Sequence, residues 1–354
     1  MGIVGEKLMD MMNAMVLPRI VSLDNCQTPL ERVELPIPDP RRGEVLIKVL
    51  ACGVCHTELD EIEGRTAPSR LPVVPGHEVV GRIVALGDGV TDWAVGERVG
   101  VGWIYSSSGS KLENLSGSFR ATGRDVNGGY AEYMCADAGY VYPIPDRFDD
   151  AEAAPLLCAG GIGYRALKLA NLFDGGLLGL TGFGGSAHLV LQLARHLYPR
   201  TKIYVFARDQ RSREFALELG AHWAGATDDR APERLHAIID TTPAWKPIVE
   251  ALRNLRPAGR LVINAIRKED ADKDYLSRLC YHDHLWMEKE IKSVANITHT
   301  DIAEFLPIAA EIPIRPQVQT YTLAQANRAL VELKRGHVRG AKVIVMDASV
   351  RRPG

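Results

Sequence analysis

The chain has 354 residues, which at about 150 residues per domain predicts two domains. Hydrophobic residues make up 46% and charged residues 24%, close to the averages of folded proteins, so the composition excludes disordered and fibrous classes. A formal net charge of −2 provides no basic surface, so neither nucleic acid nor an anionic membrane is an expected partner. Six scattered cysteines do not form a disulfide framework, and they favour a reducing, cytoplasmic location.

Residues 1–14 are predicted to be an extension without a regular pattern. Glu6, Lys7 and Asp10 interrupt the apolar run that a signal peptide needs. No stretch of the chain approaches the roughly 18 apolar residues of a membrane helix. The protein is therefore expected to lack both a targeting segment and a membrane span.

A β-rich part extends from about residue 14 to residue 145. Short apolar runs separated by turn residues predict its strands, which include 44–49, 79–86 and 98–101. After Cys158 the pattern changes to alternating strands and helices. Buried strands are expected at 177–181, 202–206, 237–240, 260–265 and 291–294. Helices are expected at 188–197, 212–219 and 247–255. This alternation predicts an α/β fold with a doubly wound parallel sheet.

The last part of the chain carries a predicted helix at 323–335 and a predicted strand at 341–346. No helix follows that strand, which is therefore expected to return to the first domain. The predicted organisation is discontinuous: residues 1–160 and 297–354 form one domain, and residues 161–296 form a dinucleotide-binding domain inserted between them.

A glycine-rich turn connects the first strand of the alternating half to its helix. Gly182, Phe183, Gly184 and Gly185, followed by Ser186 and Ala187, fit the pattern G-x-G-x-x-A. The first glycine permits a tight turn, the second lets a pyrophosphate approach the backbone, and the helix N-terminus faces the phosphates. The strand, turn and helix context favours a dinucleotide site over an ordinary glycine turn.

The end of the second strand indicates which dinucleotide is preferred. An NAD site usually places an acidic residue there to bind the ribose 2′-hydroxyl. Here that place holds Ala207, with Arg208 beside it, which suits a 2′-phosphate. NADP(H) is the favoured cofactor. NAD(H) stays open, because Asp209 is near enough to reach the ribose.

Cysteine and histidine residues in the first half have the chemistry of a metal site. Cys55, His77 and the distant Cys158 would give two thiolates and one imidazole with an open fourth position, as in catalytic zinc sites. Each residue alone is as easily explained by burial in a core, and Cys52 with Cys55 could be a redox pair.

Taken together, these motifs resemble the zinc-dependent alcohol dehydrogenases of the medium-chain dehydrogenase/reductase family. The resemblance runs from about residue 14 to residue 347 and rests on three segments: 53–57 (Gly-Val-Cys-His-Thr), 76–78 (Gly-His-Glu) with Gly81 and Gly87, and 155–160 (Pro-Leu-Leu-Cys-Ala-Gly). It implies a mostly β, GroES-like catalytic domain and a Rossmann cofactor domain. It also implies that Cys55, His77 and Cys158 are zinc ligands with Glu78 close by, and that Cys52 is not a ligand.

The resemblance also implies roles for residues around these ligands. Glu58 would orient His77, where the family more often has Asp. Thr57 would accept the alcohol proton, and Asp60 stands where many members end the proton relay on a histidine. His56 and Arg339 would reach the cofactor pyrophosphate, and Arg339 would also pair with Glu78. Asn264, Ala265 and Val294 would lie beside the nicotinamide.

The chain departs from the family in the segment 106–119. Members with a second, structural zinc carry four cysteines there, whereas this serine-rich and glycine-rich segment has none. One zinc ion per chain is therefore expected.

The expected activity is reversible hydride transfer between a primary or secondary alcohol and a nicotinamide dinucleotide, in a cleft between the two domains. The small alcohol or aldehyde is the expected partner, together with further copies of the chain in a homodimer or homotetramer. Two alternatives remain: a zinc-free quinone or enoyl reductase of the same superfamily, and a non-catalytic cofactor-binding scaffold.

Overall fold

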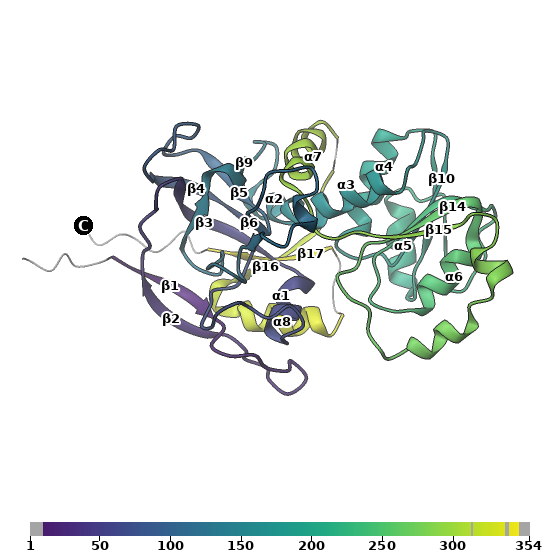
Figure 1. Cartoon of the computed structure of the whole chain (residues 1–354), viewed down its shortest axis with the longest axis horizontal. Coiled ribbons are helices and arrows are strands. Elements are labelled where there is room, and N and C mark those ends of the chain that lie inside the picture. The colour runs from purple at the N-terminus through teal and green to yellow at the C-terminus, as the bar shows by residue number, and fades with distance from the viewer. Residues whose placement is uncertain (1–9, 313, 337–339, 347–354) are drawn as a thin grey trace, which may run out of the picture. The chain divides into compact units, whose positions relative to one another are not determined.

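The computed structural model describes residues 10–312, 314–336 and 340–346 (Figure 1). The chain divides into two compact units. The first comprises Met1–Leu157, Val318–His337 and Lys342–Gly354, and the second comprises Cys158–Gln317 and Val338–Ala341. The second unit is thus an insertion in the sequence of the first.

The first unit is mostly β structure. Its strands are β1 (Met11–Val16), β2 (Glu31–Pro36), β3 (Glu44–Val54), β4 (Val79–Leu86), β5 (Arg98–Val101), β6 (Ile104–Ser106), β7 (Arg120–Ala121), β8 (Tyr133–Asp137), β9 (Val141–Pro143), β16 (Val318–Thr322) and β17 (Ala341–Val345). Its helices are α1 (His56–Ile62), α2 (Asp150–Ala153) and α8 (Ala326–Lys334), with short turns η1 (Glu113–Leu115), η2 (Ala138–Tyr140), η3 (Ala154–Leu157) and η6 (Leu323–Gln325).

The long strand β3 organises the main sheet of this unit. Val45, Ile47 and Val49 are buried while Lys48 is exposed, so one apolar face of the strand packs on the core. β3 pairs in antiparallel fashion with β4, β8 and β17. The sheet order is β16-β17-β3-β4-β5-β9, with β8 beside β3. The pairing of β17 with β3 confirms that the last strand returns to the first domain.

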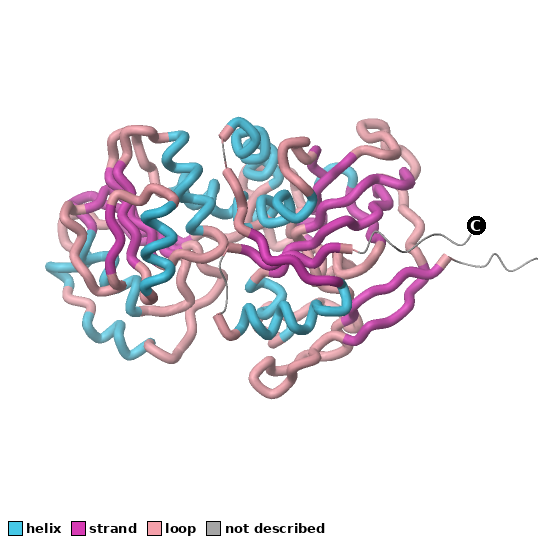
Figure 2. Tube along the Cα trace, turned by 180° about the vertical axis from the view of Figure 1, so that it is seen from behind, coloured by secondary structure: helices cyan, strands magenta, loops and turns pink. Residues whose placement is uncertain are grey.

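The strand β1 corrects one prediction. Residues 11–14 were expected to belong to an extension, but β1 begins at Met11 and pairs with β2 from Met11↔Pro36 to Val16↔Glu31. Figure 2 shows this ribbon as a pair of magenta strands. Met12 and Ala14 are buried by the pairing. Because that burial depends on a partner strand about twenty residues away, the local sequence pattern does not predict the start of β1.

The second unit is a Rossmann-type α/β sheet. Its strands are β10 (Leu177–Thr181), β11 (Lys202–Phe206), β12 (Trp223–Gly225), β13 (Leu235–Asp240), β14 (Leu255–Ile263) and β15 (Glu290–Ser293). Its helices are α3 (Ala159–Leu169), α4 (Ala187–Leu197), α5 (Gln210–Glu218), α6 (Lys246–Asn254) and α7 (His299–Glu311), with short turns η4 (Lys273–Arg278) and η5 (Tyr281–Leu285). Figure 1 labels α4 above and α6 below strands of this sheet.

The strands of the second unit are parallel and follow the order β12-β11-β10-β13-β14-β15. This order reverses direction beside β10, the arrangement of doubly wound sheets, whose ligands bind outside the carboxyl ends of the strands. The fold prediction is confirmed. The short strand β12 was not predicted, because three residues are too few to show a period. Among the described residues, no helix is long and apolar enough to cross a membrane.

The observed border between the units differs from the expected borders at 160 and 297. Residues 297–317 lie with the second unit, because α7 packs on α3. Asp301, in the first turn of α7, accepts hydrogen bonds from Arg165 at 2.7 Å and Lys168 at 3.2 Å, both on α3. Residues 158–160 also cluster with the second unit.

Candidate active site

Helix α1 places its first residues by a capping interaction. Cys55 is the N-cap, and Glu58 Oε2 accepts a hydrogen bond from the backbone N–H of Cys55 at 2.9 Å. This hydrogen bond is one of the two contacts that define a capping box, and it holds the Cys55 backbone at the start of the helix. Glu58 Oε1 lies 2.5 Å from Nδ1 of His77. One carboxylate therefore ties the cysteine loop to the histidine.

His77 and Glu78 directly precede β4, and glycines make room around them. A Cβ atom on Gly53 would lie 1.7 Å from Glu78 Oε2, so the Glu78 side chain fits only against glycine. Gly76 has a φ of +101°, and a Cβ atom there would lie 2.5 Å from the Tyr130 ring. His77 and Glu58 are both 0% exposed. The glycines around this segment thus serve close packing.

Cys158 completes a group of four ligand-type side chains. It is the N-cap of α3, directly after the turn η3 that ends the first stretch of the first unit. One ligand atom from each of Cys55, His77, Glu78 and Cys158 lies within 4.8 Å of the others. Cys52 is buried and is not a member of this group.

The group fits a zinc ion by its chemistry. Two thiols, an imidazole and a carboxylate are donors that zinc accepts in proteins. The second ring nitrogen of His77, Nε2, is buried without a hydrogen bond of good geometry among the described residues. Because Glu58 contacts Nδ1, it leaves Nε2 as the nitrogen for a metal, the usual arrangement of a carboxylate behind a ligand histidine.

The electrostatics of His77 also favour a cation. Burial lowers the pKa of His77, but the Glu58 carboxylate and the Cys55 sulfur together outweigh burial and raise the pKa well above its usual value. A proton is therefore held strongly at this ring when no metal is present. A metal ion would take the place of that proton.

The predicted proton-relay residues lie along α1. Thr57 is buried, and its hydroxyl lies 3.7 Å from the Cys55 sulfur, at the edge of the ligand group. Asp60 is buried too, and its Oδ1 accepts a hydrogen bond from Arg65 Nε at 2.6 Å. His56 is exposed at the first position of the helix. The structure thus places Thr57 beside the Cys55 ligand and pairs the buried Asp60 with the exposed Arg65.

Glu61 is a buried acid near the site that the sequence reasoning missed. Trp103 Nε1 donates a hydrogen bond to Glu61 Oε1 at 3.2 Å. Burial and the nearby Glu58 charge raise the pKa of Glu61 to about 8. Glu61 follows Glu58 by three residues, which places both side chains on the same face of α1. This spacing is the signal by which the sequence could have identified Glu61. Glu61 also fixes the indole of Trp103, which packs in a small apolar cluster with Phe119.

The segment 106–119 closes on itself through another buried acid, Glu113. Glu113 Oε2 accepts hydrogen bonds from the Tyr140 hydroxyl at 2.6 Å and from the Gly109 N–H at 3.1 Å. The Ser107 hydroxyl donates to the Glu113 carbonyl oxygen at 3.3 Å. These contacts organise the segment without any cysteine.

The predicted cofactor residues of the second unit gather at the carboxyl ends of its strands. Gly182 follows β10 with a φ of +77°, and a Cβ atom on it would lie 2.8 Å from the Thr242 side chain. A Cβ atom on Gly184 would meet nothing within 4 Å, so the backbone of the turn is open to a ligand on that side. Phe183 differs from its neighbours, because it is buried against Phe215.

The end of β11 carries no acidic side chain free to face a ribose. Ala207 is buried, and its N–H donates to Gly225 O at 2.9 Å. Arg208 is exposed. Asp209 is the N-cap of α5, and both of its carboxylate oxygens accept hydrogen bonds from Ser212, at 2.8 and 2.7 Å. The carboxylate of Asp209 is therefore engaged in capping α5.

The predicted nicotinamide residues follow β14 and β15. The Asn264 side chain donates to Ser186 Oγ at 3.3 Å, which links it to the glycine turn, and Ala265 is the next residue. Val294 is buried, and its N–H donates to Ile263 O at 2.9 Å. Arg339 lies outside the described residues.

Comparison with known proteins identifies the family. Residues 41–146 match the alcohol dehydrogenase GroES-like domain. The chain is 41% identical over 331 residues to the probable alcohol dehydrogenase AdhA of Mycobacterium tuberculosis (strain CDC 1551 / Oshkosh), covering 90% of this chain and 93% of that protein. The chain belongs to the medium-chain alcohol dehydrogenases. The enzyme is accordingly an oxidoreductase.

Further relatives agree. An alcohol dehydrogenase of Geobacillus stearothermophilus is 34% identical over 330 residues, covering 89% of this chain and 95% of that protein. The structure of a cinnamyl alcohol dehydrogenase from Sorghum bicolor superposes with a TM-score of 0.80 at 26% identity, covering 95% of the enzyme and 98% of that chain. The CAD of Helicobacter pylori, solved with NADP(H), has a TM-score of 0.82 at 22% identity, covers 97% of the enzyme and 100% of that chain, and shares the fold.

Proposed function

We propose that the enzyme is a zinc-dependent, NADP(H)-preferring dehydrogenase that interconverts a primary or secondary alcohol and its aldehyde or ketone. The observation that carries this proposal is the group of Cys55, His77, Glu78 and Cys158, whose ligand atoms lie within 4.8 Å of one another. When bound, zinc supplies Lewis-acid chemistry that makes an alcohol more acidic and a carbonyl more electrophilic. Cys55, His77 and Cys158 would hold the ion.

The surrounding residues of this chain prepare that site. Glu58 fixes the ring orientation and tautomer of His77, and the capping bond to Cys55 fixes the first ligand. Glu78 is buried against Gly53, and one of its carboxylate oxygens lies in the ligand group. Two thiolates balance the +2 charge of the ion in a buried setting.

Thr57 is the proposed acceptor of the alcohol proton, because its hydroxyl is the one on α1 that lies beside the Cys55 sulfur. Asp60 is the proposed next group in the relay. Arg65 holds Asp60 Oδ1, so the proton would have to arrive at Oδ2. Substitution Thr57→Val should lower kcat while zinc content is kept.

The NADP(H) preference rests on the end of β11. Ala207 stands where NAD enzymes carry an acid, Arg208 is exposed, and Asp209 is occupied as a helix cap. Arg208→Asp should raise KM for NADP⁺ relative to NAD⁺. The exposed Arg256, in β14, is the control, and an equal effect of Arg256→Asp would oppose this assignment.

One zinc ion per chain is proposed, because residues 106–119 contain no cysteine and are held together by Glu113 instead. We also propose a cytoplasmic homodimer or homotetramer. The four residues of the edge strand β15 are all exposed, as they would be in a strand that a second copy covers.

The test is turnover of ethanol, 2-propanol and benzyl alcohol, followed by the absorbance of the reduced nicotinamide, with metal content measured on the same sample. We expect activity that a chelator abolishes and zinc restores, at one zinc per chain. Chelator-insensitive reduction of quinones or enoyl substrates would replace this proposal with a zinc-free reductase. Absence of turnover across alcohols, aldehydes and ketones would favour a non-catalytic scaffold.

A further inference from the structure

The second unit contains a buried ion pair that the proposed mechanism does not use. Asp240, the last residue of β13, is 0% exposed. Lys268 lies in the loop after β14, and its side chain is 9% exposed. Lys268 Nζ contacts Asp240 Oδ2 and donates a hydrogen bond to the backbone carbonyl of Thr242 at 2.6 Å. The lysine thus joins two loops at the carboxyl edge of the sheet.

The other oxygen of Asp240 extends this connection to the glycine turn. Asp240 Oδ1 accepts hydrogen bonds from Thr181 Oγ1 at 2.5 Å and Thr242 Oγ1 at 2.8 Å. Thr181 is the residue immediately before Gly182. The Thr242 side chain fills the space that a Cβ atom on Gly182 would occupy. A single carboxylate therefore links the ends of β10 and β13 with the start of the turn.

Backbone contacts complete the cluster. The Asn264 N–H donates to the Asp240 carbonyl oxygen at 2.7 Å, and the Glu269 N–H donates to Pro243 O at 2.7 Å. The Asn264 side chain reaches Ser186. The loop 264–269 is thereby fixed against both the loop 241–243 and the glycine turn. By contrast, the loop at the end of β11 is held by Arg213, which donates to the carbonyl oxygens of Ala207 and Arg208 at 2.8 and 3.0 Å.

A buried ion pair adds little net stability, because desolvation of the two charges offsets most of their attraction. What such a pair supplies is a defined geometry: a lysine with one carboxylate and one carbonyl oxygen as partners has few alternative positions. The geometry it defines here is that of the loop carrying Asn264 and Ala265.

We propose that Lys268 is a positioning residue for the nicotinamide half of the cofactor. The inference rests on the proposed function, in which Asn264 and Ala265 lie beside the nicotinamide. Lys268 holds their loop at a fixed distance from the glycine turn through Asp240 and Thr242. The adenine half is positioned by the separate contacts of Arg213, so it does not depend on Lys268.

The test compares two ligands that differ by the nicotinamide. Affinities for NADPH and for 2′-phospho-ADP-ribose, which keeps both riboses and lacks only the nicotinamide ring, are measured on the zinc-loaded enzyme. Lys268→Met should weaken NADPH binding about tenfold, or about 1.4 kcal/mol. The same substitution should leave the affinity for 2′-phospho-ADP-ribose unchanged, and Lys268→Arg should restore most of the NADPH affinity.

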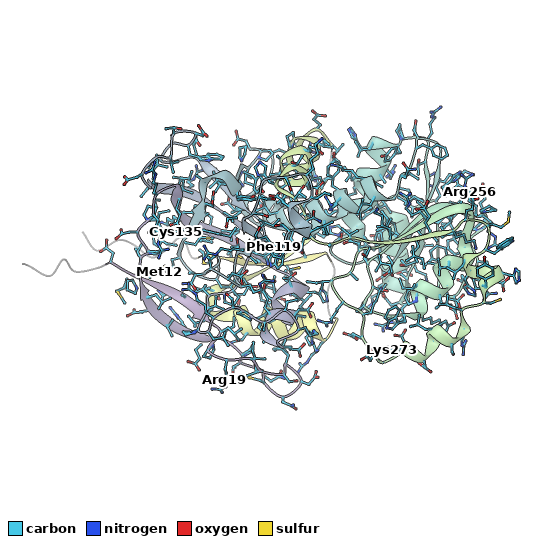
Figure 3. All side chains as sticks on the ribbon, in the orientation of Figure 1. Met12, Arg19, Phe119, Cys135, Arg256 and Lys273 are labelled. Carbon is cyan, nitrogen blue, oxygen red and sulfur yellow. The ribbon has the colours of Figure 1, made fainter. Side chains whose placement is uncertain are left out.

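Lys273 is the matched control, because it lies at the periphery of the second unit with a side chain that is 60% exposed (Figure 3). Lys273→Met should change neither affinity. Because Lys268→Met leaves Asp240 buried without its partner, the double variant Lys268→Met with Asp240→Asn is measured alongside, and it should show the same selective loss.

Two results would overturn the inference. Unchanged NADPH affinity in Lys268→Met and in the double variant would show that the ion pair does not position the ligand. An equal loss of affinity for NADPH and for 2′-phospho-ADP-ribose would show a general structural role. Failure of the proposed function is distinguishable from either, because it would be seen in the unsubstituted enzyme, as no turnover of alcohols or no binding of NADPH, and not as a difference between the variants.

Discussion

Two buried glutamates of the first unit, Glu58 and Glu113, behave differently although both are nearly inaccessible to water. Glu58 contacts Nδ1 of His77 and accepts from the Cys55 N–H, so its partners belong to ligand-type residues. Glu113 accepts from the Tyr140 hydroxyl and the Gly109 N–H. Its partners belong to its own segment and a neighbouring turn.

The difference shows what decides the role of a buried carboxylate. Glu58 leaves one atom of its partner, Nε2 of His77, without a hydrogen bond of good geometry among the described residues, so the contact prepares a donor for something else. Glu113 accepts hydrogen bonds from a hydroxyl and an amide of its own surroundings, and neither group is of a metal-ligand type. The first arrangement is expected to affect activity and the second to affect stability, and the following experiments test that division.

The largest effect is expected from removing a ligand. Cys158→Ser replaces a thiolate donor by a weaker hydroxyl, and zinc content should fall to a small fraction of one ion per chain. We expect kcat/KM to fall by more than about 100-fold, beyond the usual range for residues behind a ligand. Metal analysis and steady-state kinetics measure the two quantities. The exposed Cys280 is the control, and a comparable loss in Cys280→Ser would contradict the assignment.

Next in size is Glu58→Gln, which keeps the shape of the side chain but removes its charge. The amide stabilises the cation-binding form of His77 less well, so zinc affinity or kcat/KM should fall about 10- to 100-fold. Glu58→Asp should recover part of the loss, because the carboxylate is restored one methylene short. An unchanged zinc affinity in Glu58→Gln would place Glu58 in the same structural class as Glu113. Glu97→Gln, at an exposed position, controls for the change of net charge.

A smaller effect, on stability alone, is expected from Glu113→Ala. Loss of the carboxylate leaves the Tyr140 hydroxyl and the Gly109 N–H without their acceptor, which should cost about 2 kcal/mol in the free energy of unfolding. Urea denaturation measures this change. Leu115→Ala, at an exposed position of the same turn, should stay within about 0.5 kcal/mol of the parent. A large loss of zinc in Glu113→Ala would contradict the assignment of Glu113 to stability and Glu58 to activity.

The smallest effect is a pH dependence that Tyr140 contributes. Partial burial and the adjacent Glu113 raise the pKa of Tyr140 to about 12 from an ordinary value of about 10. Between these values the unfolded chain loses the phenolic proton first, so the stabilisation is complete below pH 10 and is lost as the pH rises to 12. The stability difference between the parent and Tyr140→Phe should shrink over that range. Parallel curves would show that Glu113 does not hold this hydroxyl.

The fold was largely predictable from local patterns. The apolar runs at 44–49, 177–181 and 202–206 coincide with β3, β10 and β11. What the patterns missed depended on distant partners. β1 was assigned in part to an extension because its burial requires β2, and α7 was placed with the wrong unit because its attachment is an ion pair between Asp301 and Arg165.

The site was predictable where chemistry is tied to residue type and spacing. Cys55, His77 and Cys158 were identified by motif, and the structure gathers them with Glu78. Glu61 and the pair of Asp240 with Lys268 were not identified. These residues stand out because they are buried and bind a partner elsewhere in the chain. Neither property can be predicted from the adjacent residues in the sequence.

The sequence by itself therefore determined the alternation of strands and helices, the glycine turn, the ligand types and the absence of cysteines in 106–119, because each depends on a few adjacent residues and their conformational or chemical preferences. Only the tertiary structure decided that Asp60 pairs with Arg65, that Asp209 caps a helix, and that Glu58 and Glu113 are both buried but with different partners. An ionised carboxylate offers the same two acceptor oxygens everywhere, and its role is set by the groups that the fold brings against it.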